Sequence, residues 1–375
     1  MGKTKRFSAL ALVAVLGLAA AACGDDEEST STDAPAASEA PAASEAPSAT
    51  EAPGATEAPA GSEVPAGEGP KVGLAYDTGG RGDGTFNDSA AVGADKAKTE
   101  LGATVDELEA TTDEDRAPNL ATLTGNGDNP IITVGFLWSD TLAAAAADNP
   151  DVTYAIVDGF VEAPNVRVLS FAEEQGSFLV GAAAALKSTT GHIGFIGGQE
   201  IDLIKKFEAG YIAGAKAVNP DIVVESQYLG AAGDNAAWGS PDKAKEIALG
   251  WYADGADVIY TAAGGSGAGT IEAAVEADAW AIGVDSDQYL TVGDPAAQEH
   301  ILTSMLKRVD TAVFETVKAF ADGDTAGGIF TYDLSVDGVG YATSGGFIDD
   351  IVDQLETFKA QIISGEIVVP TSPEA

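Results

Sequence analysis

Short apolar runs alternate with helix-like stretches along the chain from residue 71 to residue 321. The runs are rich in Val and Ile, and most are apolar along their whole length, which is typical of parallel strands covered by helices on both faces. Regular alternation of strand and helix predicts doubly wound α/β units. The expected strands are KVGLAY (71–76), ATVDELEA (103–110), IITVGF (131–136), VTYAIVD (152–158), VRVLSF (166–171), HIGFIGG (192–198), IVVESQYL (222–229), DVIYTAA (257–263), WAIGVD (280–285) and ILTSML (301–306).

Some ten strands are many for one doubly wound sheet, so the pattern predicts two similar lobes. We place the N-terminal lobe at 71–170 and the C-terminal lobe at 171–300, with 301–375 as segments that cross back between them. Hinge segments are expected near 169–173 and 301–306. Residues 345–370 are expected to form a helix followed by a short strand.

The N-terminus has the pattern of a secretory signal. Residues 1–22 carry Lys3, Lys5 and Arg6 and then an apolar run that is too short for a comfortable membrane span. Small residues lead directly to Cys23, the one cysteine of the chain, as in a bacterial lipoprotein in which the thiol is acylated. The alternative is an ordinary secreted protein in which the cysteine is not modified and has no function. In either case no intramolecular disulfide can form.

Residues 23–70 are predicted to be a disordered tether between this anchor and the folded part. SEAP, TEAP or SEVP recurs every six residues from 38 to 65. Regularly spaced prolines interrupt helices and sheet ladders, and the segment has almost no large apolar side chains to bury.

The chain is strongly acidic, with a formal charge of −40. Removing the signal, which holds three of the 19 basic residues and none of the 59 acids, makes it −43. Such a charge argues against nucleic acid or an anionic lipid surface as a partner. We expect a monomer.

The residues that follow the predicted strands indicate where a binding site lies. In open α/β sheets ligands bind beyond the carboxyl ends of the strands. Carboxylates and glycines gather there, and glycines let a ligand approach the backbone while carboxylates favour hydroxyl or amine partners. The strand ends in question are Tyr76-Asp77 with the loop GGRGDGTFN (79–87), GFLWSD (135–140), Val157-Asp158-Gly159, AGGSG (263–267) and VDSDQ (284–288).

Several of these stretches together resemble the Bmp family, the basic-membrane-protein-like lipoproteins that serve as solute-binding subunits of ABC importers. The resemblance extends over nearly all of 71–340. It implies a type I periplasmic-binding-protein fold, two doubly wound parallel-sheet lobes joined by a hinge, with a purine nucleoside held in the cleft and delivered to a permease. It rests on Asp77 with GTFN (84–87), FAEEQGSFLVGAAAA (171–185), GFIGG (194–198), AAGGSGAG (262–269), AIGVDSDQ (281–288) and LTSMLKRVD (302–310).

The resemblance assigns the base of the nucleoside to the first lobe. Phe86 would stack on the base, Asn87 would read its edge, and Asp77 would accept from a ring or exocyclic N–H. Asp158 would serve the base or the ribose. Trp238 stands where the family usually has a phenylalanine and would form the second stacking platform.

The ribose would be held mainly by the second lobe. Asp285 would chelate its hydroxyls, and Lys307 would donate to it and neutralise part of the surrounding acid. Gly264 would give close backbone contact. Structural interpretations also exist: Phe86 and Trp238 can cover local apolar clusters, Asp285 can cap a helix, and Lys307 can be solvated.

Other functional classes are weaker. The sequence has no P-loop, no G-x-S-x-G elbow and no Cys/His cluster for zinc, so no cofactor or metal is expected, and the protein is not expected to be an enzyme. A nucleoside hydrolase is the closest enzymatic alternative. A membrane sensor without transport and a sugar-binding protein would share most of the features above.

Overall fold

The computed structural model describes residues 68–373, which lie within one compact unit. The predicted signal peptide, Cys23 and nearly all of the predicted tether lie outside the described residues. None of the described helices is both long and apolar enough to cross a bilayer.

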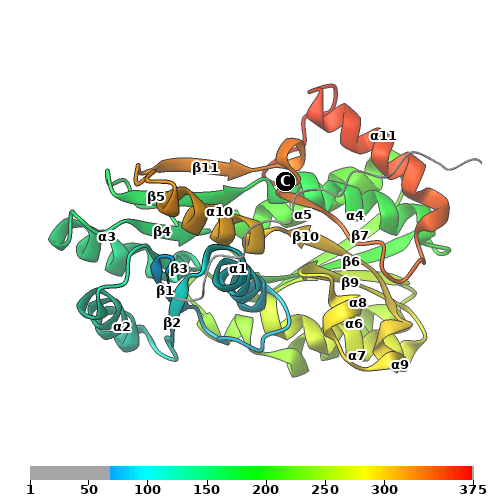
Figure 1. Cartoon of the computed structure of the whole chain (residues 1–375). Helices are drawn as coiled ribbons and strands as arrows, with labels where there is room; N and C mark the ends of the chain where they lie inside the picture. Colours follow the sequence, from blue (N-terminus) through cyan, green and yellow to red (C-terminus); the bar gives the residue numbers. More distant parts are fainter. Residues whose placement is uncertain (1–67, 374–375) are drawn as a thin grey trace, which may run out of the picture. The chain divides into compact units, whose positions relative to one another are not determined.

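The first sheet has six strands in the order β11-β5-β4-β3-β1-β2, and all of its pairings are parallel. Helices α2 and α3 cover one of its faces and α1 and α10 the other, with α1 packed along α10 (Figure 1). Its strands are β1 (Lys71–Tyr76), β2 (Thr104–Glu109), β3 (Ile131–Val134), β4 (Tyr154–Val157), β5 (Val166–Phe171) and β11 (Gly328–Tyr332). Its helices are α1 (Phe86–Leu101), α2 (Asp113–Asn126), α3 (Ser139–Asp148) and α10 (Val309–Ala321).

The second sheet repeats this arrangement in the order β12-β10-β9-β8-β6-β7, with only the short edge strand β12 antiparallel. Phe195 and Tyr260 face α4 and α5, whereas Ile196 and Ile259 face α6, because successive side chains point to opposite faces. Its strands are β6 (His192–Gln199), β7 (Val223–Gly230), β8 (Val258–Ala262), β9 (Trp280–Asp285), β10 (Ile301–Lys307) and β12 (Val339–Tyr341). The helices are α4 (Glu173–Lys187), α5 (Asp202–Val218), α6 (Pro241–Ala253), α7 (Gly267–Ala277), α8 (Gln288–Thr291), α9 (Pro295–Gln298) and α11 (Val352–Ile363).

The two strand orders are equivalent position by position. The pairs β1 and β6, β3 and β8, β4 and β9, and β5 and β10 hold the same places in their sheets. The α/β prediction with two similar lobes is therefore confirmed, and each predicted strand is present to within a few residues.

The chain crosses between the sheets three times, through β5–α4, β10–α10 and β11–β12. The expected helix near the C-terminus is α11, but the short strand expected after it is wrong. Instead, the chain turns back on the end of α11, where the backbone N–H of Ile367 donates to the carbonyl of Gln361 at 3.1 Å, and 366–370 pairs with no strand of the described chain.

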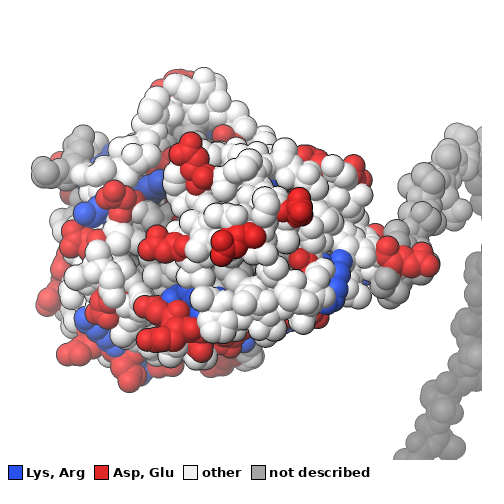
Figure 2. Space-filling view, turned by 90° about the vertical axis from the view of Figure 1, so that its left-hand side faces the viewer, with Lys and Arg blue, Asp and Glu red and all other residues white. Residues whose placement is uncertain are grey.

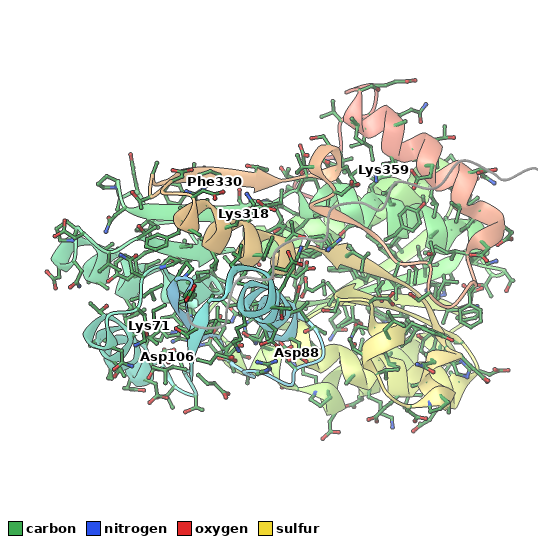
Figure 3. All side chains as sticks on the ribbon, viewed as in Figure 1. Lys71, Asp88, Asp106, Lys318, Phe330 and Lys359 are labelled. Carbon is green, nitrogen blue, oxygen red and sulfur yellow. The ribbon has the colours of Figure 1, made fainter. Side chains whose placement is uncertain are left out.

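Most charged side chains lie on the outside of both lobes, and Arg167 is one of the buried exceptions. Acidic residues are more frequent than basic ones on the face that Figure 2 shows, as the composition requires. Lys71 pairs with Asp106 at 3.2 Å beside the edge strand β2, and Arg167 stacks on Phe330 of the opposite edge strand, with 4.0 Å to the ring centroid (Figure 3).

Candidate functional site

A cavity of about 670 Å³, open solvent at its mouth included, lies where the carboxyl ends of the two sheets face each other. Its walls come from both lobes. They are Asp77, Thr78, Asp83, Phe86, Asn87, Gly135, Phe136 and Asp158 from the first, and Leu203, Ile204, Phe207, Trp238, Ala262, Ala263, Gly264, Gly265, Val284, Asp285 and Lys307 from the second.

All eight residues proposed from the sequence line this one cavity, although 230 positions separate the first from the last. Two aromatic residues in the wall were not proposed, Phe136 and Phe207. The strand-end argument could have found Phe136, because it follows β3 directly. Phe207 lies inside helix α5, where it has the sequence appearance of an ordinary core residue.

The loop between β1 and α1 is held by its own acidic side chains. Asp83 accepts from the backbone N–H groups of Thr85 and Asn87, each at 2.9 Å. Asp88 accepts from the N–H groups of Gly82 and Gly84. Asp83 thus satisfies a free donor in the first turn of α1, whereas Asp88, inside that turn, binds the loop glycines to the helix. The loop is therefore held in a defined conformation by its own hydrogen bonds, and this conformation places Phe86 at the cavity.

Asn87 is buried and binds the loop itself. Its Oδ1 accepts from the backbone N–H of Asp77 at 3.1 Å, and its Nδ2 donates to Asp83 at 3.0 Å and to the carbonyl of Thr78 at 3.4 Å. The amide thus joins the end of β1 to the start of α1. One lone pair of Oδ1 is left for a ligand.

Asp77 faces the cavity with one of its two carboxylate oxygens. Oδ1 accepts from the N–H of Thr78 at 2.8 Å and from the buried Arg116 guanidinium at 3.2 Å. Burial raises the pKa of Asp77, and these donors limit the rise. Oδ2 lies against Gly135, where any Cβ would overlap it. The glycine after β3 therefore leaves space for this oxygen.

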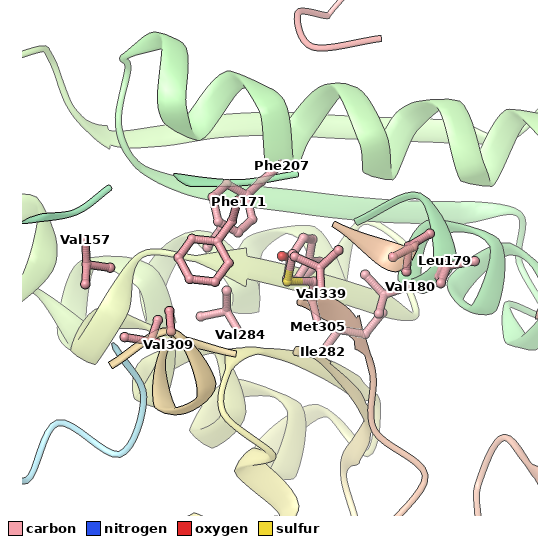
Figure 4. Close-up of a cluster of buried hydrophobic side chains, with 14 of the residues drawn as sticks. Val157, Phe171, Leu179, Val180, Phe207, Ile282, Val284, Met305, Val309 and Val339 are labelled. Atoms are coloured by element: carbon pink, nitrogen blue, oxygen red, sulfur yellow. The ribbon is translucent and has the colours of Figure 1, made fainter. Parts of the chain in front are cut away.

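Lys307 forms the most buried ion-pair cluster of the site. It ends β10, is 1% exposed, and pairs with Asp158 and, at 3.0 Å, with Glu173. Three phenylalanine rings surround its ammonium at 5.0–5.4 Å from their centroids: Phe86, Phe171 and Phe207. Figure 4 shows Phe171 and Phe207 together among the buried apolar side chains. Burial lowers the pKa of Lys307, but the carboxylates, Asp158 first, outweigh burial and raise it overall.

Asp158 and Asp285 occupy equivalent positions, at the carboxyl ends of β4 and β9. Both have left-handed backbones, with φ of 60° and 63°. A non-glycine residue with such a φ carries strain, which aspartate tolerates better than most residues, and this strain concentrates at functional sites. Both side chains are thereby directed to the cavity.

The two carboxylates differ in their partners. Asp158 pairs with Lys307 through Oδ2, and burial raises its pKa to about 6. Asp285 is 8% exposed, and no described residue donates a hydrogen bond to its carboxylate. Burial raises the pKa of Asp285 to about 7, although Lys307 opposes the rise. Asp285 is thus an acceptor with free lone pairs in the wall of the cavity.

Trp238 contributes an aromatic wall from the second lobe. It ends a short 3₁₀ turn after β7, and its ring lies against Gly198 of β6, where a Cβ would overlap the indole. Its backbone carbonyl is the nearest atom to Gly264, at 3.7 Å from the position of a Cβ there. Gly264 has φ +54° and begins the turn after β8. Gly198 thus leaves the space that the indole occupies.

The lobes also meet at the rim of the cavity. Ser286 donates to the carbonyl of Thr85 at 2.8 Å, and Thr291 donates to the carbonyl of Gly84 at 3.0 Å. Both bonds connect the loop after β1 to the segment after β9. They join the two lobes one and two residues before Phe86.

The site shows no arrangement typical of metal binding. Among residues 68–373 no group of three or more His, Cys, Asp or Glu side chains is placed to hold an ion. Two of the cavity's acids pair with cations instead, Asp77 with Arg116 and Asp158 with Lys307. The arrangement can accept hydrogen bonds from hydroxyl or N–H groups and can stack on a flat ring.

Comparison with known proteins agrees with this architecture. The sequence profile of the Bmp family, described as ABC transporter substrate-binding protein PnrA-like, matches residues 71–373. The chain is 35% identical to the CD4+ T-cell-stimulating antigen of Listeria monocytogenes over 321 residues, which cover 80% of this chain and 88% of that protein. It is also 35% identical over 319 residues to the ABC transporter nucleoside-binding protein BmpA of Lactococcus lactis, with 80% and 89% covered.

A solved structure extends the likeness to three dimensions. The crystal structure of an ABC transporter solute-binding protein from Aeropyrum pernix K1 superposes with a TM-score of 0.70 at 29% identity and covers 80% of this chain and 94% of that one. This confirms the periplasmic-binding-protein fold. The family profile and relatives of similar length match the chain along its folded part. The chain therefore belongs to the Bmp family of ABC transporter substrate-binding proteins.

Proposed function

We propose that this substrate-binding protein captures nucleosides, with purine nucleosides preferred, and delivers them to an ABC permease. The observation that carries the proposal is the buried carboxylate of Asp285, which accepts no hydrogen bond from the described residues and shares its cavity with aromatic rings of both lobes. A nucleoside matches both features, because it combines a flat base with a ribose diol.

The base would lie between Phe86 and Trp238. Stacking of a base on an aromatic side chain is worth about 1–3 kcal/mol, and a purine offers the larger face. Asp77 Oδ2 would accept from a ring or exocyclic N–H, and Asn87 Oδ1 would use its remaining lone pair. Asn87 would then have a double role, since its amide also holds the loop that carries Phe86.

The ribose would lie toward the ion-pair cluster. Its hydroxyls would donate to Asp285 and to Asp158 Oδ1, which is buried and accepts no hydrogen bond within the described chain. The Lys307 ammonium donates to Asp158 and lies within ion-pair distance of Glu173, so an N–H remains that would donate to a ribose oxygen. Gly264 would let the ligand approach the backbone after β8.

Closure would follow from the division of these groups between the lobes. A ligand that touches Phe86 and Asp77 on one side and Trp238 and Asp285 on the other gains both sets of contacts only when the lobes are shut. The closed form would be the one that the permease recognises. A relative named for nucleoside binding, BmpA of Lactococcus lactis, supports the choice of ligand.

We also propose that the mature protein is a monomer anchored on the extracytoplasmic face of the membrane through an acylated Cys23, with residues 24–70 as the tether. Palmitate labelling of the cells should mark the protein, and Cys23→Ser should abolish both the label and its retention in the membrane fraction. Labelling that persists in this variant would refute the anchor.

Calorimetry of the purified protein against adenosine, guanosine, inosine, uridine and ribose tests the ligand. We expect the purine nucleosides to bind most tightly, uridine more weakly, and ribose least. Tight binding of ribose without any nucleoside would favour a sugar-binding protein. Release of free base from inosine would favour a hydrolase. A bound nucleoside without uptake by cells that express the neighbouring permease would favour a sensor.

A further inference from the structure

Glu173 is a buried carboxylate that has no role in the ligand site described above. It is the first residue of α4, is 0% exposed, and does not line the cavity. Its Oε1 lies 3.0 Å from the Lys307 ammonium, and its Oε2 accepts from Lys206 of α5 at 3.1 Å. The Lys206 ammonium is also 3.4 Å from the carbonyl of Phe171. Charges of alternating sign thus lead inward from the half-exposed Lys206 through Glu173 to Lys307.

The two carboxylate partners of Lys307 belong to different lobes. Asp158 follows β4 of the first sheet, whereas Lys307 ends β10 of the second sheet. Glu173 begins α4, which packs on β10 and on α5. A movement of the lobes that opens the cavity changes the distance from Lys307 to Asp158. It leaves Glu173, Lys206 and Lys307 together, because all three lie on mutually packed elements.

We propose that Glu173 is a positioning residue: it holds the Lys307 ammonium at the floor of the cavity in the open and the closed state, so that Asp158 is free to exchange between Lys307 and the ligand. The proposal rests on the proposed function in one respect only, the identity of the ligand that Lys307 meets.

The physical reason is the cost of a buried charge without a partner. An ammonium inside a protein loses its hydration and becomes neutral unless carboxylates compensate. When Asp158 moves away, the remaining carboxylates that face Lys307 are Glu173 and Asp285, and Asp285 is not within ion-pair distance. The rings of Phe86, Phe171 and Phe207 favour a cation but cannot accept its protons as oxygens do.

Lys206 has a matching role for Glu173. A carboxylate as buried as Glu173, with one oxygen near Lys307, would otherwise leave its second oxygen without a donor. The neighbouring acid Glu174 adds repulsion at the same helix start, and burial raises its pKa. Lys206 balances this acidity from the solvent side.

Glu173→Gln tests the proposal, because it keeps the shape and removes the charge. Guanosine affinity is measured by calorimetry at about pH 7, and the titration of Lys307 is followed by NMR in the ligand-free protein, with its signal assigned from Lys307→Met. We expect guanosine affinity at least about tenfold weaker, the scale of one lost charged interaction. Lys307 should begin to titrate at least about one pH unit earlier than in the wild type.

Two further variants separate positioning from folding. Glu208→Gln removes another buried carboxylate of the second lobe, one that accepts from Tyr228 away from the cavity, and should leave guanosine affinity and the Lys307 titration unchanged. Glu173→Asp keeps the charge but withdraws the oxygens by one methylene. It should bind guanosine with an intermediate affinity and keep Lys307 protonated, and it serves as the test should Glu173→Gln not fold.

A Glu173→Gln protein that melts earlier, yet keeps its guanosine affinity and its Lys307 titration, would overturn the proposal and make Glu173 purely structural. Failure of the wild type to bind any nucleoside would instead refute the proposed function. The Lys307 titration is measured without ligand, so it would still decide the role of Glu173 in that case.

Discussion

The edge of one aromatic ring meets another across the cavity: Phe136, after β3, lies with its centroid 6.3 Å from that of Trp238, after β7, at an interplanar angle of 67°. The two residues belong to different sheets. Edge-to-face pairs of this kind contribute about 0.5–1.5 kcal/mol beyond the area that they bury. The contact therefore stabilises the packing of the two lobes and fixes the indole in the wall of the cavity.

Phe136→Ala should weaken guanosine binding by about two- to tenfold, since it removes this pair contact, while the melting temperature changes little because the ring is only half-buried. Calorimetry and thermal unfolding measure the two effects. An unchanged affinity would show that the Phe136–Trp238 contact has no influence on the ligand site.

Phe86→Ala should lower nucleoside affinity by about 5- to 150-fold, the equivalent of one stacked base, and should lower stability only moderately, because Phe86 is half-buried against the core. The matched control is Phe195→Ala, a fully buried ring of the second sheet away from the cavity, which should lower stability strongly and leave affinity unchanged. A larger loss of stability in Phe86→Ala than in the control would make Phe86 a core residue.

Gly198→Ala should weaken binding although residue 198 does not line the cavity. The added methyl group would overlap the six-membered ring of Trp238 and displace the indole. Gly250 of α6 has open space around it, so Gly250→Ala serves as the control and should be neutral or slightly stabilising through helix propensity. Tryptophan fluorescence should shift in the first variant and not in the second.

Asp285→Asn should stabilise the ligand-free protein at pH 8 while abolishing nucleoside binding. The folded-state pKa of Asp285, about 7, lies above its ordinary value of 3.8, so the folded state holds the proton more tightly. The destabilisation by Asp285 is absent below about pH 4, grows as the pH rises, and is complete above about pH 7.

We expect a gain in the free energy of unfolding on the order of 2 kcal/mol at pH 8, smaller than the shift alone would give because Lys307 loses an attractive neighbour, and almost none at pH 4. Urea unfolding at both values measures it. An equal gain at both pH values would mean that the ionisation of Asp285 is not its cause.

Nucleoside affinity should rise with pH up to about 7 and then remain constant. Ribose hydroxyls donate to the ionised form of Asp285, so binding releases the proton that the free protein holds below its pKa of about 7. The expected slope is at most about tenfold per pH unit below that value. Calorimetry in buffers of different ionisation enthalpy detects the released proton, and a flat profile from pH 5 to pH 8 would contradict an ionised Asp285 as the ribose acceptor.

Much of the site could be predicted because the strand ends were recognisable. Asp77, Asp158 and Asp285 each terminate an apolar run, and parallel strands bring their carboxyl ends to one edge. The use of Asn87 within the loop could not be foreseen, since its partners, Asp77 and Asp83, are set by the path of the loop. The absence of a strand at 366–370 was equally hidden, because a strand requires an available neighbour as well as an apolar sequence.

The sequence by itself determined the alternation of strands and helices, the two-lobed α/β class and the family, because these depend on local periodicity and on motifs close in the chain. Only the tertiary structure decided that Phe136 meets Trp238, that Asp285 lacks a partner while Asp158 pairs with Lys307, and that Glu173 lies behind Lys307. The reason is physical. Burial, and with it the charge state and the free lone pairs of each side chain, depends on residues more than a hundred positions away that come together only when the lobes pack.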